Sequence, residues 1–135
     1  MKGGLLIVLL GLFSGRCFGQ FPALMYDSRQ AVHEDAVGTI KKIVSPYGKN
    51  LKVVYKNGQK RKILKSSLWG FQNRSGKLYR LYDNKAMRVL RQSDIIKYAY
   101  KQPGTNHFSW RYSAGLDSPV FRTKRRARHL SLIEY

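Results

Sequence analysis

The stretch that decides the fold is LKVVYKNGQKRKILKSSLWGFQNRSGKLYRLYDNKAMRVLRQSDIIKYAYK, residues Leu51–Lys101. Short apolar and aromatic runs alternate here with breaks rich in Asn, Asp, Gly and Ser, which tolerate left-handed backbone angles. The breaks are Asn57-Gly58, Asn73–Gly76, Asp83–Lys85 and Gln92–Asp94. Each break is typical of a hairpin turn rather than of a helix end, so the stretch predicts an antiparallel β-meander.

The predicted strands are short and follow one another closely. They are 36–45, Leu51–Tyr55, Lys60–Lys65, Leu68–Gln72, Lys77–Tyr82, a strand after the third turn, and Ile95–Lys101. A flat sheet of such strands would leave one face and two edges bare. We therefore expect an all-β antiparallel meander of five to seven short strands, forming a strongly bent sheet or a small open barrel.

Strand register is open at the first hairpin. A two-residue loop at Asn57-Gly58 would set Leu51 opposite Leu64, whereas a three-residue loop with a bulge would set Val53 opposite Ile63. The two registers expose different lysines and arginines, and the residues themselves do not decide between them.

The turn at Asp83–Lys85 is expected to close as a three-residue loop, which places Arg80 directly opposite Arg88. One face of this hairpin would then be wholly apolar and aromatic: Tyr79, Leu81, Met87 and Val89. Like charges in opposite positions are unfavourable unless an anion neutralises them. Our hypothesis is that Arg80 and Arg88, flanked by Tyr82 and Tyr98, bind a phosphate or carboxylate. The alternative is that both arginines extend into solvent and bind nothing.

The C-terminal part is aromatic and then basic. Asn106–Tyr112 is either an added strand or a loop packed over one end of the barrel. Thr123 is placed to cap a short helix from Lys124, although basic residues in a first helical turn oppose the helix dipole. The basic tail is either solvated or a tether to an anionic membrane leaflet. Its residues are Arg122, Lys124, Arg125, Arg126 and Arg128.

Residues 1–19 have the three parts of a secretory signal: a positive start, an apolar run over Leu5–Phe13, and small residues before a cut at Gln20. The run is too short for a membrane anchor, and Arg16 disfavours a lipoprotein reading at Cys17. Cys17 is the single cysteine, so the mature chain would have no disulfide, which suits a bacterial envelope. The expected division is a signal peptide at 1–19, a lead-in at 20–35, the β-meander domain at 36–101 and a cover at 102–135.

Charge is the abnormal feature of the composition. The chain has 26 Lys and Arg against 7 Asp and Glu, a net charge of +19. Removal of the signal would leave 24 basic residues against 7 acidic ones, a net charge of +17. Residues 51–101 hold 14 basic residues against two aspartates, so the excess charge lies on the meander. Such a field favours anionic partners.

Three segments resemble a loosely defined group of exported small β-proteins of Bacteroidetes whose function is not known. They are GKLYRLYDNKAMRVL (76–90), LWGF (68–71) and YSAGLDSPVFRTKRRAR (112–128). The resemblance covers about the second half of the chain. It implies an exported all-β protein with a Thr-headed basic helix, and no function comes with it. The chain departs from the group at RRARHL, where a more amphipathic helix is usual.

No catalytic pattern stands out. The carboxylates are scattered, His33, His107 and His129 fall in separate segments, and no Gly-x-Ser-x-Gly, Ser-x-x-Lys or Gly-rich phosphate loop is present. We expect no enzyme activity, no metal and no cofactor. The expected role is a non-catalytic binding or structural module, periplasmic, at the cell surface or extracellular, that contacts anionic polysaccharide, lipopolysaccharide or phospholipid head groups. The alternatives are a small hydrolase of envelope polymers and a nucleic-acid-binding β-barrel; export argues against a specific nucleic acid, and a protein partner stays open.

Overall fold

The computed structural model describes residues 21–28 and 39–133, with side chains described as far as 129. The expected signal peptide, half of the lead-in and the start of the strand predicted at Ala36 lie outside these residues. The predicted fold class is confirmed: the chain is mostly β, with a curled antiparallel half-barrel, a second small sheet and one short C-terminal helix.

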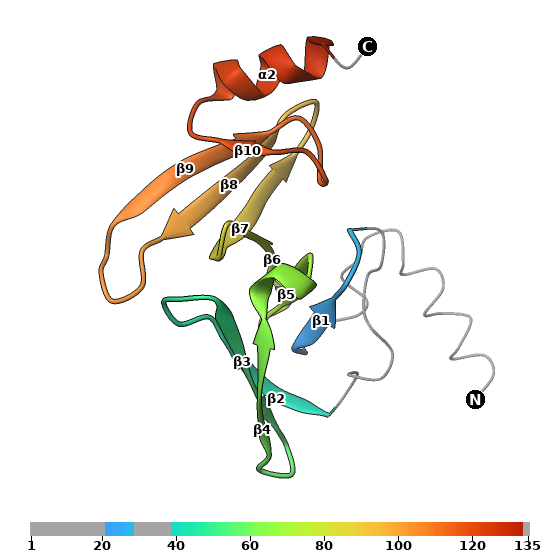
Figure 1. Cartoon of the computed structure of the whole chain (residues 1–135), viewed down its shortest axis with the longest axis vertical. Helices are drawn as coiled ribbons and strands as arrows, with labels where there is room; N and C mark the ends of the chain where they lie inside the picture. The colour runs from blue at the N-terminus through green and yellow to red at the C-terminus, as the bar shows by residue number, and fades with distance from the viewer. Residues whose placement is uncertain (1–20, 29–38, 134–135) are drawn as a thin grey trace, which may run out of the picture.

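The larger sheet has seven antiparallel strands in the order β1-β5-β6-β7-β8-β9-β10. Figure 1 shows its strands curling through the middle and upper parts of the molecule. The strands are β1 (Ala23–Met25), β5 (Gly70–Gln72), β6 (Leu78–Tyr82), β7 (Lys85–Gln92), β8 (Ile96–Lys101), β9 (Phe108–Ser113) and β10 (Val120–Phe121). Three of them extend the expected meander: β1 lies within the lead-in, β9 is the added strand that the aromatic segment allowed, and β10 lies in the expected cover.

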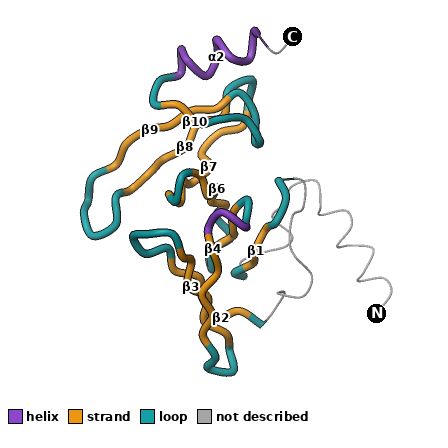
Figure 2. The backbone as a smooth tube through the Cα atoms, in the orientation of Figure 1, coloured by secondary structure: helices purple, strands orange, loops and turns teal. Residues whose placement is uncertain are grey.

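The smaller sheet has three strands in the order β2-β3-β4. They are β2 (Ile40–Val44), β3 (Asn50–Tyr55) and β4 (Lys60–Leu64). The 3₁₀-helix η3 (Lys65–Ser67) follows β4 and redirects the chain, so that the predicted single meander is divided between two sheets. Figure 2 shows this division, with β2–β4 below β6–β10 of the larger sheet.

The hairpin of the small sheet closes with a three-residue loop, 56–58. The Gly58 N–H donates to the Tyr55 carbonyl, the Tyr55 N–H donates to the Gln59 carbonyl, and Gly58 has a φ of 93°. Leu51 therefore faces Ile63, and Val53 faces Arg61. The loop has three residues, as one alternative expected, but it begins at Lys56, so neither of the two registers left open by the sequence is correct.

The β6–β7 turn has two residues rather than the expected three. Asp83 and Asn84 both adopt left-handed angles, with φ of 52° and 60°, the geometry of the tight turns that match the twist of paired strands. Tyr82 consequently pairs with Lys85, and Arg80 with Met87. The predicted Arg80–Arg88 pair is wrong by one residue, and the predicted apolar face is divided between the two sides of the sheet.

The large sheet has two cores on its two opposite faces. Residues paired directly across strands share a face, and Phe71, Tyr79, Arg88, Ala99 and Trp110 form one such row. On this face, β5 and β6 pack against the small sheet. The core there consists of Leu24, Ile40, Leu51, Val53, Ile63, Leu68, Phe71 and Leu81.

The second core lies on the other face, farther along the sheet. Met87, Ile96 and Tyr98 are buried there beneath Leu116 and Val120. As a result, the first face is left open over β8 and β9, where Trp110 is 48% exposed and Phe108 is 60% exposed.

The C-terminal helix α2 (Lys124–Ile133) forms despite its basic first turn. The Arg126 N–H donates to Thr123 Oγ1 at 3.3 Å, as the sequence predicted for a cap. Ala127 is fully buried. In Figure 1, α2 lies at the opposite end of the molecule from the small sheet.

Candidate functional site

Three of the four residues predicted to bind an anion come together in the structure. Arg80 is buried, and its guanidinium lies over the rings of Tyr82 and Tyr98, with centroid distances of 5.1 and 5.8 Å. Arg88 is absent from this group because the two-residue turn places it on the opposite face of the sheet. The two arginines therefore cannot hold one anion between them.

The donors of Arg80 are used inside the protein. One terminal nitrogen donates to Tyr98 Oη at 2.9 Å, and the other donates to the carbonyl of Ser118 at 2.7 Å. Tyr98 Oη is also 2.8 Å from Ser113 Oγ, which donates to the carbonyl of Gly115. Arg80 thus fastens the loop between β9 and β10 to the sheet, which is a structural role.

The predicted basic tail is exposed at Arg122, Lys124, Arg125, Arg126 and Arg128. Arg128 forms an ion pair with Asp94 at 3.3 Å, which ties α2 to the β7–β8 turn. The Arg126 guanidinium lies 5.3 Å from the centroid of the Phe121 ring. Part of the tail charge is therefore used in holding the helix on the sheet.

A second basic surface lies on the small sheet, where the sequence had not predicted a site. Its outer face presents four exposed lysines, which we call the lysine face: Lys42, Lys52, Lys60 and Lys62. Lys52 and Lys62 lie directly opposite each other on β3 and β4. This is the like-charge arrangement that was predicted for Arg80 and Arg88, at a different hairpin.

The strands and turns of the small sheet contain no acidic residue. Residues 39–65 contain eight lysines and one arginine and neither Asp nor Glu. Two ion pairs found among the described residues lie elsewhere: Lys85–Asp83 is at the β6–β7 turn, and Arg128–Asp94 joins α2 to the β7–β8 turn. Alternating lysines in LKVVYKNGQKRK were a visible signal, but their opposition depends on the register of the hairpin.

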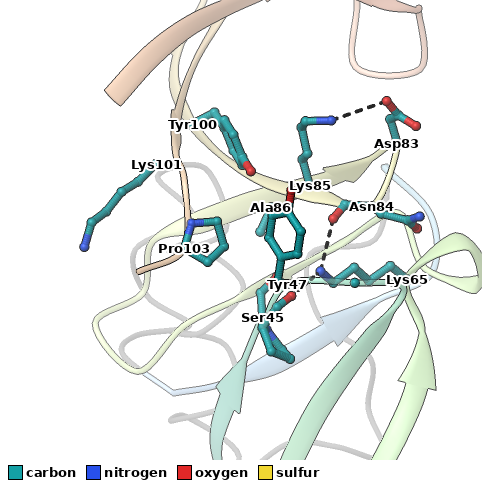
Figure 3. Close-up of a pocket in the computed structure, with 12 residues that line it drawn as sticks. Ser45, Tyr47, Lys65, Asp83, Asn84, Lys85, Ala86, Tyr100, Lys101 and Pro103 are labelled. Atoms are coloured by element: carbon teal, nitrogen blue, oxygen red, sulfur yellow. Dashed lines mark hydrogen bonds and ion pairs between the residues drawn. The ribbon is translucent and has the colours of Figure 1, made fainter. Parts of the chain in front are cut away.

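A polar pocket of roughly 250 Å³ lies where the β2–β3 turn meets the β6–β7 turn. Figure 3 shows Lys65, Lys85 and Lys101 around it, together with Tyr47, Tyr100 and the aspartate Asp83. Lys65 is buried, and its ammonium donates to the carbonyls of Pro46 at 2.7 Å and Asn84 at 3.1 Å. Desolvation by burial lowers the pKa of Lys65 below its ordinary value.

An apolar groove of roughly 470 Å³ adjoins the polar pocket. It lies along the open face of the large sheet, beside the edge of the small sheet. The two hollows share four lining residues: Ser45, Ala86, Lys101 and Pro103. The groove is where the structure places Arg88.

Two further searches concern only the residues that the structure describes. No helix among them is long and apolar enough to cross a membrane. Nor do three or more His, Cys, Asp or Glu side chains gather there into a group that could hold a metal ion.

Comparison with known proteins finds no match to this chain among family models, curated proteins or solved structures.

Proposed function

We propose that this chain is an exported, non-catalytic module that contacts an anionic polymer or lipid surface through its lysine face. The observation that carries the proposal is the placement of four exposed lysines on one face of a three-stranded sheet, with Lys52 opposite Lys62. Exposed like charges in opposite positions weaken a sheet. Binding to a polyanion explains why the chain keeps a lysine face that lowers the stability of its own sheet.

The shape of the surface favours an extended partner. The lysines lie on an open sheet face rather than in a cavity, so they suit a polysaccharide chain, lipopolysaccharide phosphates or the head groups of a bilayer. Near an anionic leaflet, each basic residue contributes about 1 kcal/mol, and this contribution falls within a Debye length. Binding should therefore weaken steeply as salt increases.

Export rests on the three-part leader at residues 1–19 and on the resemblance to exported proteins. In a bacterial host, the recovered protein is expected to begin at Gln20, as intact-mass measurement would show. Recovery of the uncleaved chain in the cell interior would contradict this part of the proposal and would make nucleic acid the obvious partner.

The lysine face is tested by replacing Lys42, Lys52, Lys60 and Lys62 with Gln in the mature chain. We expect at least a tenfold loss of affinity for heparin, lipopolysaccharide and anionic vesicles at low salt, measured by titration. The matched control replaces four exposed basic residues elsewhere with Gln: Arg91, Arg122, Lys124 and Arg125.

Both variants remove the same charge, so the control should lose no more than about threefold in affinity. Equal losses in the two variants would show that net charge alone drives binding. Single-stranded DNA belongs in the same titration, because a clear preference for it would favour the nucleic-acid alternative instead.

A further inference from the structure

The apolar groove has the composition of a ligand site rather than of a gap between sheets. Its volume of roughly 470 Å³ lies within the range of roughly 300–1,000 Å³ that is usual for small-molecule pockets. Its walls include Phe71, Tyr79 and Phe108, with Ala99 between them. Phe108 is 60% exposed and Val44 39% exposed, so large apolar side chains face solvent along the groove.

The charge of the groove has one sign. Arg88 and Lys101 line it, and none of its lining residues in the described part of the chain is acidic. Arg88 pairs across the strands with Tyr79 on one side and with Ala99 on the other. Its cation is therefore placed among the apolar residues of the groove rather than on a separate surface.

The polar pocket continues the groove at Lys101 and Ala86 and adds two cations, Lys65 and Lys85. An ammonium group has three donors, and Lys65 uses two on carbonyls. Asp83 is the acid that lines the pocket, and it pairs with Lys85 at 3.4 Å. Figure 3 shows that Lys65 and Lys85 come from different elements, and that the Lys101 side chain extends away from these two at the edge of the pocket.

We infer that the groove and the polar pocket together bind a single-chain lipid with an anionic head group. The acyl chain would occupy the groove between the sheets, and the carboxylate or phosphate would lie among Lys65, Lys85 and Lys101. A polymer of sugars would leave the aromatic and aliphatic walls unsatisfied, and a neutral amphiphile would leave the cations unneutralised. The lysine face lies on the outer side of the small sheet and meets the groove at Val44, but none of its four lysines lines the groove or the polar pocket.

The test uses dodecanoate below its micelle concentration and isothermal titration of the mature chain. Dodecyltrimethylammonium has the same chain with the opposite charge, and acetate has the head without the chain. We expect saturable binding of one dodecanoate per chain, and binding at least tenfold weaker for each of the other two probes. Equal affinity for the two dodecyl probes would overturn the inference.

Three variants test where dodecanoate binds. Phe108→Ala removes an exposed wall of the groove, and Lys101→Gln removes the cation shared by the two hollows. Each should weaken dodecanoate binding about fivefold or more. Lys62→Gln removes the same charge from the lysine face and should change the affinity less than twofold.

The results for the two sites can be separated. A loss as large in Lys62→Gln as in Lys101→Gln would show adsorption by net charge and overturn the inference, whatever the outcome with heparin. Circular dichroism checks that Phe108→Ala stays folded, and Lys101→Gln, at an exposed side chain, supplies a second variant. If the wild-type chain elutes as a dimer that Phe108→Ala returns to monomer, a second copy occupies the groove and the lipid assignment is wrong.

Discussion

Arg80 shows how a basic residue can be held inside this protein without a carboxylate. It is 5% exposed, and among the described residues its partners are neutral oxygens and the two rings of Tyr82 and Tyr98. Hydrogen bonds from a charged donor contribute more than neutral ones, and the aromatic faces add to them. The residue that looked like half of an anion site is therefore part of the fold.

Arg80→Met should lower the free energy of unfolding by about 2–3 kcal/mol, because it leaves the Ser118 carbonyl and Tyr98 Oη without their charged donor. Urea denaturation measures this change. The matched control is Arg88→Met, a half-buried arginine on the opposite face, which should cost about 0.5 kcal/mol or less. Similar costs for the two substitutions would show that the loop is not held by Arg80.

The contribution of Lys65 to the free energy of unfolding depends on pH in the alkaline range. Burial lowers its pKa in the folded chain, so the unfolded chain binds more protons between that lowered pKa and the ordinary value of 10.5. The free energy of unfolding contributed by Lys65 therefore rises with pH across this window and is flat below it. It bridges the two sheets through the carbonyls of Pro46 and Asn84.

Lys65→Met removes the titrating group, so the difference in unfolding free energy between wild type and variant should shift in favour of wild type as pH approaches 10.5. At neutral pH the difference should not vary with pH. Urea midpoints from pH 7 to 10.5 measure both parts of this expectation. A difference that stays constant up to pH 10.5 would mean that the Lys65 pKa is not lowered.

At the scale of elements, strands and turns could be predicted because their signals are local. Alternation in Leu51–Tyr55, the turn residues Asn57-Gly58 and the capping position of Thr123 each depend on a few neighbours in sequence. Register could not be predicted in the same way. It depends on whether Lys85 joins the turn or the strand, and the left-handed angles of Asp83 and Asn84 decide this.

Local sequence signals could not predict the division into two sheets either. Lys60–Lys65 reads as one strand, but Lys65 itself leaves β4, begins η3 and bonds carbonyls of two distant turns. The candidate site could not be predicted from the sequence for the same reason. The lysines of β3 and β4 are visible in the sequence, whereas their opposition on one face requires the hairpin register, and the groove requires the packing of one sheet beside the other.

At the scale of the whole molecule, both ends are basic, but they differ in the acidic residues that accompany the basic ones. The small sheet, at one end in Figure 1, lies in a stretch with nine basic residues and no acids, residues 39–65. At the other end, α2 has one of its arginines paired with Asp94. Repulsion within the small sheet should make its stability sensitive to salt, because mobile ions screen exposed charges.

Lys62→Glu tests whether the lysine face is kept for binding rather than for stability. The substitution places a carboxylate opposite Lys52 and should raise the free energy of unfolding by about 0.5–1 kcal/mol at low salt, a gain that shrinks as salt is added. Affinity for heparin should fall in the same variant. Lys77→Glu makes the same change of charge at an exposed position on the large-sheet side and should give a smaller effect on both quantities.

The informative result is that Lys62→Glu raises the free energy of unfolding and lowers the affinity for heparin. A residue that weakens the fold and strengthens polyanion binding is explained by a role in binding, since solubility alone would be served equally by Glu at that position. Thermal unfolding in 20 and 300 mM salt, beside heparin titration of the same samples, measures both quantities. If Lys62→Glu lowers stability at low salt, the lysines do not repel one another as their positions imply. The lysine face then does not reduce the stability of the fold, and the proposal that it is kept for binding fails.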